Sequence, residues 1–197
     1  MRAADIDWGL ILAGGAGRRV GGADKGLLPG PDGTPLVASV ARRLRPQVGQ
    51  LFISCNRNRA RYAAHADALL QDSLPDFAGP LAGLASFPWQ SHPGLLLLSP
   101  CDTPRLPADF GQALARPLQR DPSLQVSYAV VGAQPHYLHA LLRTQALATL
   151  ADFLAEGGRA VRHWYATLAC APVAFADAED TFANWNTLSA RSSRARD

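Results

Sequence analysis

The sequence contains no apolar run long enough to cross a membrane. The run at 95–98 has only four residues, whereas a spanning helix needs about 20. The three cysteines are an odd number without a CxxC pair, which argues against a disulfide framework and against a zinc site. Acidic residues occupy positions 5 and 7, where a signal peptide would have its apolar stretch. We therefore expect a cytoplasmic protein that neither enters a membrane nor carries disulfides.

Charge is also scarce. Charged residues make up 18% of the chain, below the roughly 25% of an average globular domain. The net charge of +3 is too small to argue for a nucleic-acid partner, so we expect none. Apolar residues reach 48%, and 197 residues can bury one sizeable core. We expect a single domain over 1–190 and a polar tail, 191–197, that frays.

Lysine is nearly absent. Of the 19 basic side chains, all but Lys25 are arginine. Codon bias explains an excess of arginine, and it makes the exception informative. We interpret Lys25 as a position that needs a compact ammonium group, where a planar guanidinium would not fit.

Hydrophobic periodicity and turn residues predict alternating strands and helices. Such alternation predicts an α/β fold, a three-layer sandwich around a mostly parallel central sheet. The expected strands are 6–13, 51–55, 68–71, 95–99, 126–131, 137–142 and 171–175, and the expected helices are 35–48, 60–68, 79–89, 107–118, 144–155 and 161–168.

A glycine-rich loop follows the first expected strand. Residues 12–27 read LAGGAGRRVGGADKGL, with five glycines between 14 and 22 and three basic side chains. Backbone amides exposed by glycine, together with these cations, suit a polyphosphate. The loop is neither a P-loop nor a dinucleotide fingerprint, because Lys25 precedes glycine and Val20 occupies the place of a third glycine. The alternative is a surface loop without a ligand.

Two aspartates follow expected strands. Asp102 lies in the segment PCDTP (100–104), and a stiff carboxylate past a central strand is well placed to bind Mg²⁺ beside a phosphate. The alternative is a cap of the next helix. That helix should begin near Pro107 and contain Asp109, so Asp102 does not fit as its cap. Asp72 could reach the same edge of the sheet, or could be a simple turn residue.

Amides alternate with apolar residues in the segment FANWNT (182–187). As a strand, this segment would place Asn184 and Asn186 on one face, where they could position a ligand. The alternative is that Asn186 or Thr187 caps a last helix.

Together these residues resemble the molybdenum cofactor guanylyltransferase family, which has a nucleotide-diphospho-sugar transferase-like fold. The resemblance covers most of the chain, and it implies a nucleotide-binding first half and an acceptor-binding second half. It rests on the 12–27 segment, on Asp72 with GPLAG (79–83), on PCDTP (100–104) and on NWNT (184–187). It implies transfer of GMP from GTP to the phosphate of molybdopterin with release of pyrophosphate, and it implies Mg²⁺ as cofactor. It also implies transient contacts with molybdenum cofactor biosynthesis proteins or molybdoenzyme chaperones.

The resemblance implies a nucleotide site formed by Leu12, Ala13, Gly14, Gly15, Lys25, Ser54, Asp72 and Asp102. Arg19 and Lys25 would meet the phosphates and Asp102 would hold Mg²⁺, so these three are the expected catalytic residues. Ser54 takes the place of an asparagine that is usual in the family, and Asn56 is the alternative contact. The acceptor site would include His136, Arg159, Asn184 and Asn186.

The implied reaction needs no covalent enzyme intermediate, because the acceptor phosphate is already an ionised nucleophile. Catalysis would consist of positioning and of neutralising charge. Two rival functions stay open at this point. One is a cytidylyl- or sugar-nucleotidyltransferase of the same fold, and the other is a non-catalytic nucleotide-binding regulator.

Overall fold

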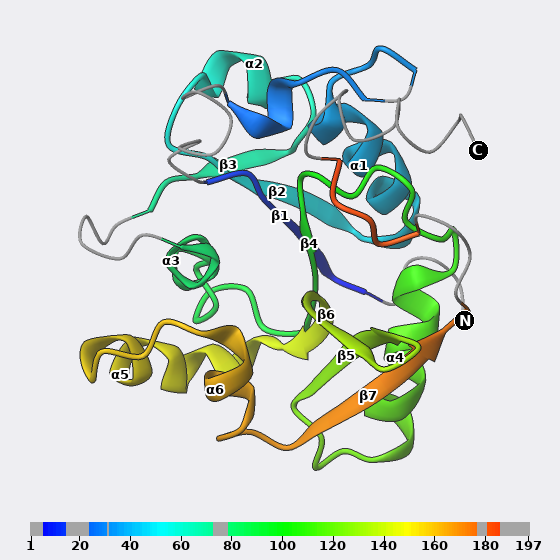
Figure 1. Ribbon diagram of the computed structural model, residues 1–197. Helices are drawn as coiled ribbons and strands as arrows, with labels where there is room; N and C mark the ends of the chain where they lie inside the picture. The colour runs from blue at the N-terminus through cyan, green and yellow to red at the C-terminus, as the bar shows by residue number, and fades with distance from the viewer. Residues whose placement is uncertain (1–5, 15–23, 31, 73–78, 177–180, 186–197) are drawn as a thin grey trace.

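The computed structural model describes residues 6–14, 24–30, 32–72, 79–176 and 181–185 (Figure 1). Seven strands form one sheet in the order β3-β2-β1-β4-β6-β5-β7. β6 is antiparallel to both of its neighbours, and the other paired strands are parallel. The expected mostly parallel sheet is thus confirmed. The strands are β1 (Trp8–Leu12), β2 (Gln50–Ser54), β3 (Ala68–Leu70), β4 (Leu95–Pro100), β5 (Val126–Val131), β6 (Gln134–Arg143) and β7 (Cys170–Phe175).

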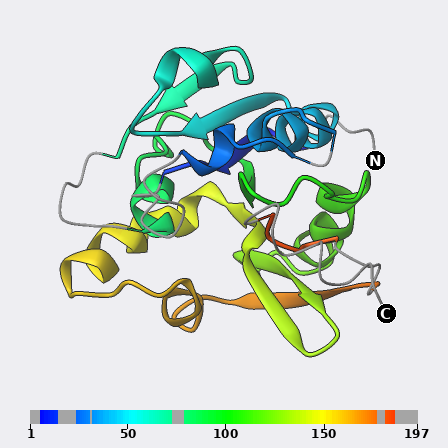
Figure 2. The ribbon, with the colours of Figure 1, turned by 45° about the horizontal axis from the view of Figure 1, so that its top comes forward.

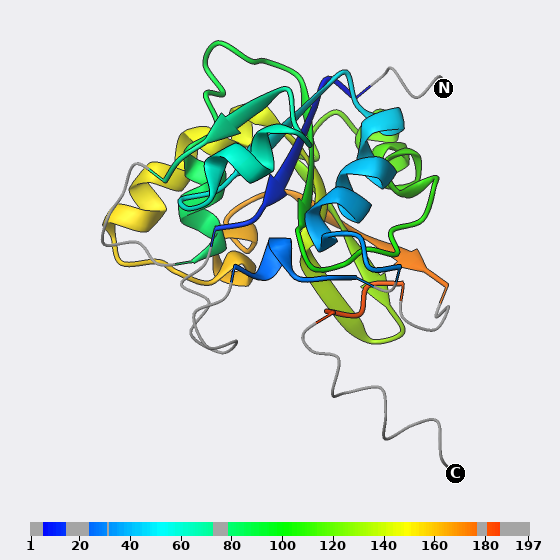
Figure 3. The ribbon, with the colours of Figure 1, turned by 90° about the horizontal axis from the view of Figure 1, so that it is seen from above.

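Helices cover both faces of the sheet, which confirms the three-layer arrangement. In Figure 3, α1 and α4 lie on one side of β1 and β4, and α3 and α5 lie on the other. α6 shares the side of α3 and α5, because its side chains pack in the same buried cluster. The helices are α1 (Leu36–Leu44), α2 (Arg59–Ala63), α3 (Pro80–Ala85), α4 (Phe110–Arg120), α5 (Leu150–Ala155) and α6 (Val161–Tyr165), with 3-10 turns η3 (Lys25–Leu27), η4 (Arg45–Gln47) and η5 (Thr144–Thr149).

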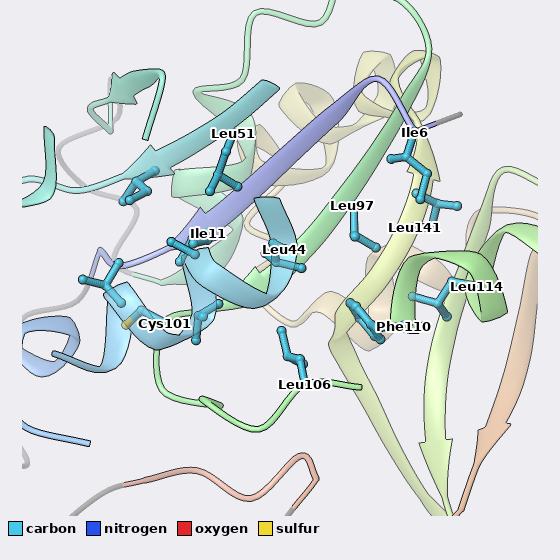
Figure 4. Close-up of a cluster of buried hydrophobic side chains, with 14 of the residues drawn as sticks. Ile6, Ile11, Leu44, Leu51, Leu97, Cys101, Leu106, Phe110, Leu114 and Leu141 are labelled. Carbon is cyan, nitrogen blue, oxygen red and sulfur yellow. The ribbon is translucent and has the colours of Figure 1, made fainter. Parts of the chain in front are cut away.

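The central strands β1 and β4 are largely apolar because both of their faces are buried. Alternate side chains of β4 enter different clusters: Leu97 packs on the α1–α4 face, and Leu96 and Leu98 pack on the α3–α5–α6 face. Figure 4 shows Leu97 and Ile11 pointing toward α1 and α4. Each such fully buried side chain contributes about 1.5–3 kcal/mol. This packing fixes the positions at which the strands end.

Several expected helices are shorter than the sequence predicts. The helix expected over 79–89 ends at Ala85, because Pro88 disfavours helical geometry at the residue before it and has no N–H. The helix expected over 60–68 ends at Ala63, because Asp67 N–H bonds the Leu51 carbonyl as the chain enters the sheet. In the helix expected over 144–155, the first six residues are 3-10. The helix expected over 161–168 ends at Tyr165.

Three further details differ from expectation or lie outside the description. Asp109 is the N-cap residue of α4 and not an interior residue, although its side chain makes no capping hydrogen bond. The described part of the 182–187 segment is not a strand: residues 181–182 form a turn and 183–185 have no regular structure. The 191–197 tail lies outside the described residues. No helix in the described ranges is long and apolar enough to span a bilayer.

Candidate functional site

The first four parallel strands bring the beginning of the glycine-rich loop beside the segments that follow β2 and β4. The Ala13 amide donates to the Ser54 carbonyl (2.9 Å), and the Cys101 amide donates to the Leu12 carbonyl (3.1 Å). These bonds continue the sheet ladder past the end of β1. The carboxyl edge therefore gathers residues from three chain segments, as the rule for open parallel sheets predicts. The Leu12 carbonyl and the Ala13 amide are therefore both engaged within the sheet.

Lys25 and Asp102 form an ion pair at this edge. The Lys25 Nζ and Asp102 Oδ2 atoms lie 2.5 Å apart. The Asp102 side chain is only 7% exposed and that of Lys25 is 33% exposed. Asp102 Oδ1 is buried and has no hydrogen-bond partner among the described residues. A buried carboxylate oxygen that accepts no hydrogen bond is unusual, because it lowers the stability of the folded protein. Asp102 is therefore a candidate for a functional role.

The carboxylate of Asp72 is held by two side chains at the end of β2, Ser54 in the strand and Asn56 just after it. The Ser54 hydroxyl donates to Asp72 Oδ1 (3.1 Å), and the Asn56 amide donates to Oδ2 (2.8 Å). The Asp72 amide in turn donates to Asn56 Oδ1 (3.0 Å). Ser54 is fully buried, and Gly83 is packed so closely that a Cβ there would lie 2.7 Å from the Ser54 hydroxyl. Ser54 thus supports Asp72, whereas Asn56 is exposed at the edge.

A cavity of about 390 Å³ lies beyond the carboxyl end of β4, where the turn between β5 and β6 meets the segment 181–185. Figure 2 shows this segment, in red, beside the β5–β6 hairpin. His136 and Asn184 both line the cavity, and the His136 ring contacts Phe182 with centroids 5.2 Å apart. Burial lowers the pKa of His136. Its imidazole is therefore neutral at pH 7.

His139 lies deeper, between this cavity and the Asp102 loop. Its Nε2 atom is 2.9 Å from the Thr103 hydroxyl, and its ring packs against Phe182 and Phe110. Burial lowers the pKa of His139 to about 3, with a smaller contribution from His136. Through its hydrogen bond with Thr103, the neutral ring connects β6 to the loop that contains the catalytic candidate Asp102. The same loop is bonded from the other side, because the Trp185 amide donates to the Asp102 carbonyl (2.8 Å).

Arg159 lies elsewhere. It belongs to the connection between α5 and α6, on the opposite face of the sheet from Phe182. Its guanidinium donates to the carbonyls of Leu154 (3.0 Å) and Gly158 (2.6 Å), where it satisfies groups at the end of α5. The structure brings His136 and Asn184 together, and it does not place Arg159 beside them.

Residues 9–171 match the model of the MobA-like NTP transferase domain. The chain belongs to the MobA-like NTP transferase family. The molybdenum cofactor guanylyltransferase of Cupriavidus taiwanensis is 42% identical over 192 residues, 95% of this chain and 96% of that protein. That of Bordetella petrii is 42% identical over 183 residues, 91% and 92% of the two chains.

Solved structures show the same fold as this MobA-like chain. Molybdopterin-guanine dinucleotide biosynthesis protein A of Archaeoglobus fulgidus superimposes with a TM-score of 0.70 at 19% identity, over 92% of this chain and 93% of that one. A protein of Aquifex aeolicus gives a TM-score of 0.71 at 13% identity, over 93% and 95%. At such identities the likeness concerns the fold alone.

The carboxyl edge of the sheet also contains residues that the sequence analysis did not identify. The carboxylate of Asp24 accepts hydrogen bonds from the Tyr62 hydroxyl and the Asn58 side chain (3.0 Å for Asn58). The sequence signal was weak, because Tyr62 belongs to no motif and only a short helical pattern surrounds it. Gly15, Arg19 and Asn186, all predicted site residues, lie outside the described residues. The individual roles predicted for the site residues remain predictions.

Proposed function

We propose that this chain transfers GMP from GTP to the phosphate of molybdopterin, free or molybdenum-bound, and releases pyrophosphate. The product is the guanine dinucleotide form of the molybdenum cofactor. The observation that carries the proposal is the match to molybdenum cofactor guanylyltransferases at 42% identity over nearly the full length of both chains. The carboxyl edge supports it, because that edge brings together the beginning of the glycine-rich loop, the Lys25 ammonium, the half-buried carboxylate of Asp72 and the buried carboxylate of Asp102.

Nucleotide would bind where β1, β2 and β4 end. Lys25 and Arg19 would neutralise the phosphates, and Asp72, held by Ser54 and Asn56, would orient the nucleoside. The acceptor would occupy the cavity lined by His136 and Asn184, which opens at the same edge. Neighbouring sites on one edge allow an acceptor phosphate to reach the α-phosphate in line, and most of the catalytic effect would come from this positioning.

The residues at the edge fit Mg²⁺. Asp102 offers Oδ1, a buried anionic oxygen without a donor, which is the kind of ligand that Mg²⁺ prefers. The described residues contain no group of three metal-binding side chains. A site with one carboxylate still fits, because Mg²⁺ keeps several waters and takes its remaining ligands from substrate phosphates. When bound, the ion would neutralise charge on the phosphates, and Asp102 would hold it in place.

We also propose the cytoplasm as the site of this reaction and transient contacts with molybdenum cofactor biosynthesis proteins or molybdoenzyme chaperones. The cytoplasmic assignment is supported by Cys55, Cys101 and Cys170, which are all free thiols.

The test is a direct transfer assay. The purified chain is incubated with molybdopterin, Mg²⁺ and either GTP or CTP, and both pyrophosphate and the dinucleotide product are measured. We expect dinucleotide product with GTP and little with CTP. The Lys25→Ala variant is the matched control, and we expect it to form much less product with GTP. Product formed only with CTP would make the protein a cytidylyltransferase. Nucleotide binding without any transfer would support the regulator instead.

A further inference from the structure

The side chain of Asp24, directly before Lys25, is bonded to a distant helix and not to its own turn. It occupies the N-cap position of η3, yet its side chain makes no capping hydrogen bond there. One carboxylate oxygen accepts from the Tyr62 hydroxyl, and the other accepts from the Asn58 side-chain amide at 3.0 Å. Both donors belong to α2 or its N-cap, more than 30 positions along the chain. Asp24 therefore joins the loop carrying Lys25 to α2.

The ring of Tyr62 also contacts the residue on the other side of Lys25. A Cβ added to Gly26 would lie 2.5 Å from the Tyr62 hydroxyl oxygen and 3.1 Å from the ring atom Cε1. Real Cβ atoms do not approach so closely, so the backbone at 26 rests directly on the phenol. One side chain thus contacts the chain immediately before and immediately after Lys25. Such a pair of contacts fixes the Lys25 Cα and restricts the volume that its ammonium can explore.

Tyr62 is itself rigid. It is fully buried and packs in the core cluster with Ile53, Cys55 and Cys101. Burial, reinforced by its hydrogen bond to Asp24, raises the pKa of Tyr62, so the phenol stays protonated and remains a donor. Asn58 adopts φ 50° and ψ 32°, a left-handed conformation that asparagine tolerates better than most residues. Its amide is thereby available to Asp24.

We propose that Tyr62 is a positioning residue for Lys25, acting through Asp24 and Gly26. It holds the ammonium at the carboxyl edge, within reach of Asp102 and of the phosphates that Lys25 would neutralise. The role of Lys25 toward phosphates rests on the proposed function, whereas its placement by Tyr62 does not. Tyr62 is fully buried, so it would affect the reaction only by where it puts Lys25.

The single lysine makes the placement directly measurable. A protein labelled with ¹³C-lysine gives one side-chain Cε resonance, which reports on Lys25 alone. Tyr62→Phe keeps the ring beside Gly26 and removes the hydroxyl, which donates to Asp24 and lies nearest to Gly26. We expect the Lys25 resonance to shift and broaden, and kcat/KM for GMP transfer to fall about tenfold. Losing a hydrogen bond to a charged acceptor has an effect of this order. We expect the decrease mainly in kcat, because the ammonium is mispositioned for charge that develops during transfer.

Tyr165→Phe is the matched control. Tyr165 is equally buried, lies on the opposite face, and its hydroxyl has no hydrogen-bond partner among the described residues. Its loss should leave both the Lys25 resonance and the kinetics unchanged. If Tyr62→Phe fails to fold, Asn58→Gly provides the test, because glycine keeps the left-handed backbone and removes only the amide. We expect a smaller shift of the same resonance and a loss of a few fold in kcat.

The proposal is overturned if Tyr62→Phe and Asn58→Gly both leave the Lys25 resonance where the wild type has it. It is equally overturned if Tyr165→Phe moves that resonance as much as Tyr62→Phe. The resonance is recorded without substrates. A wild type that transfers no GMP would therefore refute the proposed function while the measurement still decides the role of Tyr62.

Discussion

Asp102→Asn separates a functional carboxylate from a structural one. The substitution keeps the shape of the side chain and one oxygen, and it removes the negative charge. In the folded chain this charge faces the Lys25 ammonium through Oδ2, and Oδ1 has no donor among the described residues. Oδ1 is therefore the oxygen free to take a metal ion. The amide should lose that ability while it still accepts a hydrogen bond from Lys25.

The expected cost in stability is small. The partner ammonium is one-third exposed, at 33%, so solvent screens the pair and its loss should destabilise by about 1 kcal/mol. For a chain of this length that corresponds to a fall in melting temperature of about 2–4 °C. The expected cost in transfer rate is much larger, about 10²–10³, which is typical for removal of one charge-organising group. Nucleotide binding should lose most of its dependence on Mg²⁺.

The assay measures the melting temperature, GMP transfer and Mg²⁺-dependent GTP binding on the same preparation. Asp67→Asn is the control, because it breaks another carboxylate pair, with Arg45 at 2.9 Å, where β3 begins and away from the carboxyl edge. It should leave activity per folded molecule unchanged. A clearly destabilised Asp102→Asn protein with full activity would show that Asp102 is structural and that another residue holds the metal.

Three further predictions follow from the same geometry. GTP with Mg²⁺ should raise the melting temperature more than CTP, ATP or UTP at equal concentration, and a larger shift with CTP would refute the guanylyl assignment. Lys25→Ala should slow transfer about 10²–10³-fold. Lys25→Arg should also be slow, because we expect a planar guanidinium not to replace the compact ammonium beside Asp102; near-normal rates for Lys25→Arg would contradict this steric argument. His139 should make the protein sensitive to acid: the folded chain keeps the ring neutral down to about pH 3, while the unfolded chain binds a proton below its ordinary value of 6.5. Stability should therefore fall as the pH drops through this window, by up to about 1.4 kcal/mol per pH unit, and urea unfolding of His139→Gln at pH 7 and 5 should show a smaller difference than the wild type.

The positions of the strands and their burial could be predicted, because the hydrophobic pattern that indicates them is local in the sequence. The run at 95–98 is apolar throughout, and β4 is buried on both faces as that pattern indicates. The proximity of Lys25 and Asp102 could also be inferred from the sequence, since both residues follow strands that end at one edge of the sheet. The reversed direction of β6 was not, because a strand pattern reads the same in either direction.

Contacts between distant weak patterns could not be predicted. Tyr62 reads as one apolar residue in a short helix, and nothing local indicates that its hydroxyl reaches Asp24. Ser54 was expected to meet the nucleotide, yet it is buried beneath Gly83 and bonds Asp72. The charge of Arg159 favoured a role in binding an anionic acceptor. Its position is instead set by the hydrogen bond that it donates to the Leu154 carbonyl near the end of α5. In each case the three-dimensional packing decides what the side chain can contact.

The placement of the segment 181–185 has a consequence for how the candidate site is completed. Phe182 is 5% exposed and packs on Phe110 and Phe175, and the Trp185 amide bonds the Asp102 carbonyl. This segment thus completes a core built mostly from earlier segments. It also forms one wall of the cavity that His136 lines. A chain cut before residue 181 would keep all seven strands, but it would lack both this wall and the second bond on the Asp102 loop.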